Sequence, residues 1–157
     1  MNRYYVGAAA GRWDLDANWS AASGGAGGAS FPVAGDNAYL DAASPGGPTL
    51  TADAACDNLD LTGFTGTLDL VTFNLNVTLD IIIGATVPAG NVRLGTGTTT
   101  IGRHLTALAR TPFTVGTSTI KMTGTGNLSF LDTQTFEASL TATFTSFFSI
   151  PGRSTSS

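Results

Sequence analysis

The sequence predicts an all-β protein whose body is a short β-solenoid, and three observations lead to this class. First, among 157 residues there are 25 Thr and 20 Gly but only one Lys, one Glu and one Gln, a composition that suits sheets rather than helices. Second, apolar residues repeatedly alternate with Asp, Asn or Thr. Third, these segments are short, similar to one another and separated by glycines, which favours stacked coils over the alternative of a β-sandwich.

The alternating segments are the predicted strands, because a period of two buries one face of a strand. They are residues 58–61, 67–70, 74–77, 79–83, 92–94, 99–101, 118–122 and 127–130. Gly63, Gly66 and Gly84 mark turns in the first half, and two Gly-Thr-Gly motifs mark turns in the second. One segment differs: His104, Leu105 and Leu108 have roughly helical spacing, which predicts a helix over residues 102–109.

An aromatic-rich start precedes these strands and ends at a flexible, low-complexity loop over residues 20–30. Because the open end of a solenoid must be shielded from water, we expect Trp13, Trp19 and Phe31 to form a structural cap. The alternative is a sugar-stacking platform in which Tyr4, Tyr5, Trp13 and Trp19 are exposed.

The chain divides into a β-rich body with its cap, residues 1–131, and a C-terminal strand or arm, residues 132–157. The arm carries alternating apolar residues followed by further phenylalanines, more apolar surface than a small monomer covers easily. We therefore expect it to make subunit contacts. The residues assigned to these contacts are Phe136, Leu140, Phe144, Phe147 and Phe148.

Charge is distributed unevenly along a chain whose net charge is −4. Residues 1–80 hold nine acids and two arginines, whereas residues 81–131 hold four basic residues and no acid. One interpretation is drift in a charge-poor sequence; the other is electrostatic complementarity between subunits or with an acidic partner. Four scattered basic residues without interleaved aromatics are a poor nucleic-acid site.

No pattern of catalytic or metal-binding residues is apparent, so we expect no enzyme activity, no cofactor and no metal. Asp14, Asp16 and Asn18 imitate the start of a calcium loop, but the glycine and glutamate that such a loop needs are missing. The carboxylates that could line up on successive coils, as in a glycosidase, are better interpreted as solvent-facing partners of buried leucines. They are Asp57, Asp60, Asp69 and Asp80.

Two remaining residues receive structural interpretations. Cys56, the single cysteine, excludes an internal disulfide and is expected to be a small buried side chain. His104, beside Arg103, is expected at the surface. No apolar run is long enough to span a bilayer, and the start has no secretory signal core.

The first 84 residues carry a set of short motifs: Arg3-Tyr-Tyr-Val-Gly, Gly11-Arg-Trp, Asn18-Trp-Ser, Pro32-Val-Ala-Gly-Asp and then NLDLTGFTGTLDL. Together they resemble a module of structural proteins of tailed bacteriophages, and a similar opening precedes β-solenoid adhesins. The resemblance implies a β-rich, trimeric virion component and names no catalytic residue.

The expected function is therefore a non-enzymatic virion protein, made in the host cytoplasm, that decorates or cements the capsid as a trimer. Its expected partners are sister copies and other virion proteins such as the major capsid protein, with no nucleic acid and no membrane. The alternatives are a tail fibre or baseplate component and an adhesion module that binds a host glycan.

Overall fold

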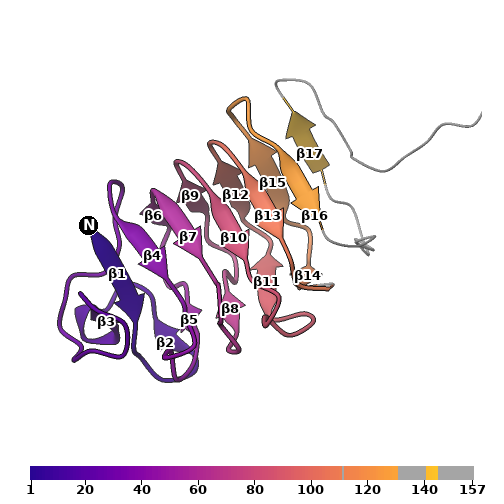
Figure 1. Cartoon of the computed structure of the whole chain (residues 1–157). Helices are drawn as coiled ribbons and strands as arrows, with labels where there is room; N and C mark the ends of the chain where they lie inside the picture. The colour runs from indigo at the N-terminus through magenta and orange to yellow at the C-terminus, as the bar shows by residue number, and fades with distance from the viewer. Residues whose placement is uncertain (111, 131–140, 145–157) are drawn as a thin grey trace, which may run out of the picture.

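The chain folds as a parallel β-solenoid, the class predicted from the sequence (Figure 1). The structure is a computed structural model that describes residues 1–110, 112–130 and 141–144. Its strands are two to four residues long and stack along one axis in three sheets. Within the described residues the helical structure is a single 3-10 turn, η1 (Asp16–Asn18).

Along each sheet the strands follow one another in the order in which the coils stack, and sheet C starts at the second coil. Sheet A contains β3 (Trp19–Ser20), β1 (Asn2–Tyr5), β4 (Asn37–Tyr39), β7 (Asn58–Asp60), β10 (Ile81–Ile83), β13 (Leu105–Ala107) and β16 (Leu128–Phe130). Sheet B contains β2 (Gly11–Arg12), β5 (Pro48–Thr49), β8 (Leu68–Asp69), β11 (Val92–Gly95) and β14 (Phe113–Val115). Sheet C contains β6 (Ala54–Cys56), β9 (Leu75–Val77), β12 (Thr98–Ile101), β15 (Thr119–Met122) and β17 (Thr141–Phe144).

The register shows how long each coil is. Ala38, Leu59, Ile81, Leu105 and Leu128 pair in succession along sheet A, so one coil takes 21 to 24 residues. All of these pairings are parallel; the exception in the described part is β3, which runs antiparallel to β1 and ends the sheet. Like residues therefore stack above like residues, which is the reason for the repeated short motifs in the sequence.

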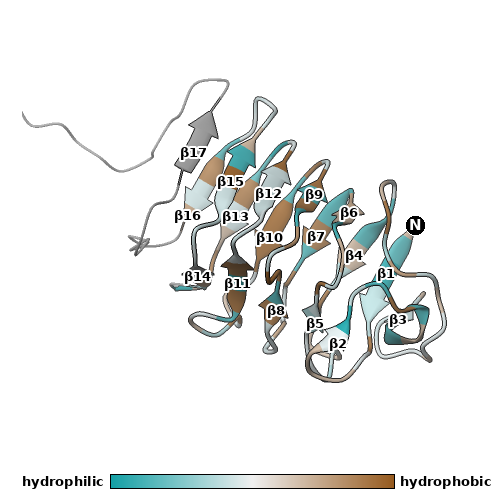
Figure 2. Ribbon diagram, turned by 180° about the vertical axis from the view of Figure 1, so that it is seen from behind, coloured by the Kyte–Doolittle hydropathy of each residue, from teal (hydrophilic) through white to brown (hydrophobic). Residues whose placement is uncertain are grey.

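The core is a column of aliphatic side chains that point inward from all three sheets. Leu59, Leu68 and Leu75 come from the three strands of one coil and are each at most 2% exposed. Strand β10, which consists of three isoleucines, is coloured as strongly hydrophobic in Figure 2, and its Ile81 and Ile83 belong to this column. The void that remains inside is about 20 Å³ and is lined almost entirely by apolar residues, so the interior is a packed core and not a binding channel.

The structure confirms a strand in each of the eight predicted segments, namely β7, β8, β9, β10, β11, β12, β15 and β16, of which β11 and β12 each extend one residue beyond the predicted bounds. The predicted helix over residues 102–109 is wrong, because Leu105–Ala107 forms strand β13 between β10 and β16. Leu105 and Ala107 point into the core and Leu108 is 44% exposed, so pairing within the sheet overrides the helical spacing.

Most of the proposed subunit-contact residues lie outside the described residues, namely Phe136, Leu140, Phe147 and Phe148. Phe144 is the last residue of β17, whose backbone pairs with β15 and lies within the arm predicted as a strand.

Candidate functional site: the N-terminal cap

The two tryptophans lie at the centre of the cap at the first coil. Trp19 is 0% exposed and Trp13 is 2% exposed, and their rings meet edge to face with centroids 4.8 Å apart. Tyr5 packs against Trp19 in the same manner at 5.3 Å. The Trp19 Nε1–H donates to the Trp13 carbonyl at 2.6 Å, so the ring burial is combined with a buried hydrogen bond.

The short motifs around the tryptophans determine how the chain turns there. The Asn18 side chain donates to the carbonyl of Arg12 at 2.8 Å, and the Asn18 carbonyl accepts from the Val6 N–H. Gly7 lies so close to the Asn18 side chain and the Tyr5 hydroxyl that an added Cβ would be 2.7 Å from both. The Val-Gly, Gly-Arg-Trp and Asn-Trp-Ser motifs therefore meet in one packed unit.

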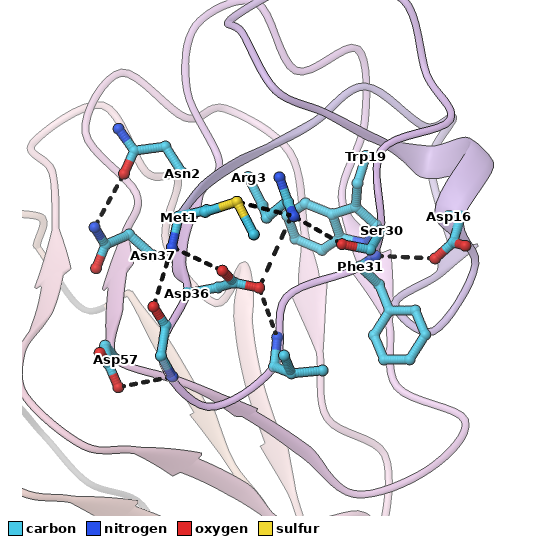
Figure 3. A network of polar contacts seen from close by, with 12 residues as sticks. Met1, Asn2, Arg3, Asp16, Trp19, Ser30, Phe31, Asp36, Asn37 and Asp57 are labelled. Carbon is cyan, nitrogen blue, oxygen red and sulfur yellow. Dashed lines mark hydrogen bonds and ion pairs between the residues drawn. The ribbon is translucent and has the colours of Figure 1, made fainter.

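The Pro-Val-Ala-Gly-Asp motif closes this unit through a polar network centred on Asp36 (Figure 3). Asp36, itself 5% exposed, accepts from the Met1 amino group at 2.8 Å and from the Val33 N–H at 3.4 Å. Arg3 lies beside it, with Nε 3.9 Å from the carboxylate and a second nitrogen donating to the Ser30 Oγ at 2.8 Å. This network joins β1 to the loop that leads into β4.

Ionisation of Asp36 is favoured by these contacts. The hydrogen bond from the Met1 amino group is the largest cause that lowers the pKa of Asp36, burial opposes it, and the Val33 N–H and Arg3 lower it further. A lowered pKa in the folded state means that this stabilisation is present above the ordinary aspartate pKa and is lost as pH falls through the lowered value.

Asp36→Asn is therefore expected to lower the free energy of unfolding by about 1–3 kcal/mol at pH 7. It should also weaken the loss of stability below about pH 4, where the unfolded aspartate begins to protonate. Urea unfolding at pH 7, 4 and 3 measures both effects. Asp41→Asn makes the same change of charge outside the network, and an equal effect of the two variants would contradict the role assigned to Asp36.

Phe31, the third predicted cap residue, is only partly buried and packs against the core. Its N–H donates to Asp16 at 3.0 Å, which attaches the returning loop to η1. The structure thus places Trp13 and Trp19 inside the cap and Phe31 at its edge. The sequence did not indicate the roles of Arg3 and Asp36, because the contacts of Asp36 with Arg3 and with the Met1 amino group join residues more than thirty positions apart.

The glycan-platform alternative requires exposed aromatic rings, and the structure buries Tyr5, Trp13 and Trp19. Tyr4 is half-buried on the outer face of sheet A, where its ring stacks on that of Tyr39 with centroids 4.8 Å apart and planes 16° apart. Since the two rings cover one another, they do not form the broad platform that the sequence suggested.

Asp14, in the segment whose spacing is similar to the start of a calcium-binding loop, is held by local hydrogen bonds. Asp14 forms a two-point contact with the Arg12 guanidinium, at 2.9 and 2.7 Å, and accepts from the Thr51 hydroxyl. The hydrogen bond from Arg12 is the main cause that lowers the pKa of Asp14 to about 2. The described residues contain no group of three or more His, Cys, Asp or Glu arranged to hold a metal ion.

The four aspartates considered as a catalytic set are separate structural acceptors. Asp60 and Asp69 each accept the backbone N–H two residues later, and Asp57 accepts the N–H of Gly35. Asp80 accepts the His104 N–H and pairs with the Arg103 guanidinium. These carboxylates therefore fix turns and connect coils, which agrees with their interpretation as partners of the buried leucines.

Part of the charge asymmetry is neutralised between neighbouring coils. Arg103 pairs with Asp80, and Arg93 lies 3.7 Å from Asp69 on the preceding coil. Two of the four basic residues of segment 81–131 thus meet acids of segment 1–80 within the same chain. Both pairs are exposed at the arginine, so each contributes little to stability.

A ladder of polar side chains runs along the edge of sheet A where its strands begin. It includes Asn2, Asn37 and Asn58, the first residues of β1, β4 and β7, and His104, which directly precedes β13. The Asn37 amide donates to Asn2 at 3.0 Å and the Asn58 amide to Asn37 at 2.8 Å. Farther along, the His104 Nδ1 accepts from the Asn127 N–H at 3.0 Å. His104 is only partly exposed and takes part in this stack, so the expectation of a plain surface residue missed its structural role.

Cys56 is 0% exposed, as predicted, and its side chain belongs to the core. Burial, with smaller effects from Asp57 and Asp36, raises the pKa of the Cys56 thiol to about 12. The thiol is therefore neutral in the folded protein and unsuited to nucleophilic chemistry near neutral pH.

A groove of about 380 Å³ opens beside the cap. The loop residues Phe31, Pro32 and Val33 form one side, and β6 with the residues before it forms the other. None of the described helical segments is long and apolar enough to cross a lipid bilayer. Comparisons with protein-family models, curated proteins and solved structures found no match to this chain.

Proposed function

We propose that this chain is a non-enzymatic structural protein of a tailed-phage virion, and that it decorates or cements the capsid as a trimer. The observation that carries the proposal is the convergence of the quoted motifs in a single cap. Gly7, Trp13, Trp19 and Asp36 come from four separate motifs and lie in one connected unit of aromatic packing and hydrogen bonds. Motifs that act together in folding support the interpretation of residues 3–84 as one structural module.

The packed body of the solenoid also supports a structural, non-enzymatic role. Its interior is filled by aliphatic side chains, and the aspartates that might have formed a catalytic pair are occupied by backbone N–H groups and arginines. A rigid body of this kind stabilises a shell by burying surface against it, and each bound copy adds to the stability of the assembly by mass action.

The number of copies in purified virions tests the proposal. A decoration protein is present in a fixed, high ratio to the major capsid protein, and cross-linking of intact particles joins it to that protein and to sister copies. Sedimentation of the isolated full chain measures whether it is a trimer. A low copy number with cross-links to tail proteins would support the tail fibre or baseplate alternative, and failure to find the chain in particles would overturn both.

The adhesion alternative has one separate test. Since Trp13 and Trp19 are buried, their fluorescence is expected to be blue-shifted and insensitive to aqueous quenchers. A red-shifted spectrum that responds to added oligosaccharides would favour glycan binding by the cap.

A further inference from the structure

Sheet C begins one coil later than the other two sheets. The first coil supplies β1 to sheet A and β2 to sheet B, and these strands pair with β4 and β5 of the second coil. The second coil's third strand, β6, has β9 on one side and is the terminal strand of sheet C on the other. The first coil therefore lacks its third strand.

The path of the chain explains this gap. After Asp14 the chain turns away into η1 and β3, which cover the end of sheet A, and it returns to the solenoid at Phe31. The returning segment is hydrogen-bonded to the next coil at Asp36, whose carbonyl accepts from the Asp57 N–H at 2.6 Å. A groove of about 380 Å³ lies beside this gap, between residues 31–33 of the returning loop and residues 52–55, and it continues over Asn76 and Thr100 on the outer face of sheet C.

The backbone of β6 faces this groove with unused hydrogen-bonding groups. The Ala54 N–H donates to the Asn74 carbonyl and the Cys56 carbonyl accepts from the Thr78 N–H, so both residues are bonded toward the next coil. Ala55, between them, directs its N–H and C=O to the other side. Within the part of the chain that the structure describes, no hydrogen bond joins Ala55 to the first coil. Such an edge is a template for an added strand.

The walls of the groove limit what can enter it. Small residues of the 52–55 segment leave room above the edge, and Trp13, Phe31 and Val33 supply apolar contacts. Two carboxylates are among the lining residues: Asp14, whose charge is paired with the Arg12 guanidinium, and Asp53, which accepts hydrogen bonds from the neutral Asn74 and supplies the uncompensated negative charge of the groove. Hydrogen bonds lower the pKa of both, so both are ionised near neutral pH. An acidic segment would be repelled and a basic one attracted.

We propose that this groove binds an extended segment of a partner protein, free of acidic residues and carrying a basic one, which adds to β6 as the missing first strand of sheet C. The recognition is β-strand addition: hydrogen bonds to Ala55 supply affinity, and the apolar walls and carboxylates select the side chains. The inference rests on the edge of sheet C alone, so it stands or falls independently of a virion role.

The test uses the full chain and a blocked heptapeptide, acetyl-TTVKVTT-amide, as the probe. Titration followed by amide NMR is expected to shift the Ala55 N–H and to slow its hydrogen exchange at saturation. The peptide acetyl-TTVEVTT-amide, which reverses the charge, is expected to bind several-fold more weakly, with the difference shrinking as salt increases. A probe N-methylated along its backbone is expected to lose binding, because it cannot donate to the edge.

Ala55→Pro removes the one N–H that faces the groove and leaves the bonds of Ala54 and Cys56 to β9 intact, a position that a sheet edge tolerates. It is expected to weaken binding of the lysine probe at least about tenfold relative to the matched control Ala55→Ser. Equal binding by the two variants, or an Ala55 amide unaffected by the probe, would overturn the proposal. So would Ala55 protection that rises with protein concentration in the absence of peptide, since the occupant would then be a second copy.

Discussion

Trp19→Ala is expected to lower the free energy of unfolding by about 3–5 kcal/mol, the range observed when a large buried aromatic is removed from a core. Trp19 is fully buried, contacts the rings of Tyr5 and Trp13, and donates to the Trp13 carbonyl. The variant leaves a cavity at the end of the core and an unpaired carbonyl in it. Urea unfolding followed by far-ultraviolet circular dichroism measures the loss.

Two comparisons give this prediction its controls. Leu15→Ala removes an apolar side chain from the same loop, but Leu15 is 46% exposed, so the change should stay within about 0.5 kcal/mol. Trp19→Phe keeps most of the ring volume and removes the indole N–H, so its effect should lie between the other two. A loss below about 1 kcal/mol for Trp19→Ala would show that the cap does not support the solenoid, since even a typical point mutation costs that much.

The regular coils could be predicted because their information is local. In the segments around Leu59, Leu75 and Ile101, alternation between apolar and polar residues reports directly which side chains point inward. The same rule failed for β13, where Leu105, Thr106 and Ala107 alternate over only three residues beside a helix-like spacing. Pairing with β10 and β16 decides that segment, and this information is not local.

Two strands of the first two coils, β2 and β5, were not predicted for a related reason. Gly11–Arg12 and Pro48–Thr49 are strands of two residues, too short to show any periodicity. They are extended because each is hydrogen-bonded to the next coil. A chain segment of this kind takes its conformation from its neighbours in the stack and has no signature of its own.

The cap was predictable in its aromatic part only. A solenoid end needs large apolar side chains, and Trp13 and Trp19 lie close together in the sequence. The contact between Arg3 and Asp36 and the open edge at Ala55 depend on where the chain leaves the coil path and where it returns. The one available signal was an aspartate after the Pro-Val-Ala-Gly turn, in a chain that otherwise carries few charges.

Glycines at the corners follow from the same stacking. At Gly95, Gly97, Gly102 and Gly124 an added Cβ would collide with a backbone carbonyl of the preceding coil. Coils in a parallel solenoid approach closely at their corners, so a residue without a Cβ is required there. This explains the Gly-Thr-Gly motifs, which the sequence marked only as turns.

Gly95→Ala is the sharpest test of this close approach. Gly95 has φ +63°, lies at a register shift between β11 and β14, and places any Cβ against the Val71 carbonyl. Alanine there meets two costs: about 1–2 kcal/mol for the left-handed conformation, and about 1–3 kcal/mol for forcing the corners of two coils apart. The expected loss of unfolding free energy is therefore about 2–5 kcal/mol, measured by urea unfolding.

Gly24→Ala is the matched control, because Gly24 has the same φ of +63° and its added Cβ would meet only the Ala43 Cβ, at 3.4 Å, an ordinary contact. It should lose only the conformational part, about 1–2 kcal/mol. The difference between the two variants therefore isolates the cost of separating the coils. If both variants lost the same stability, the spacing of the coils would not depend on a missing side chain at Gly95, and the explanation of the Gly-Thr-Gly corners would be wrong.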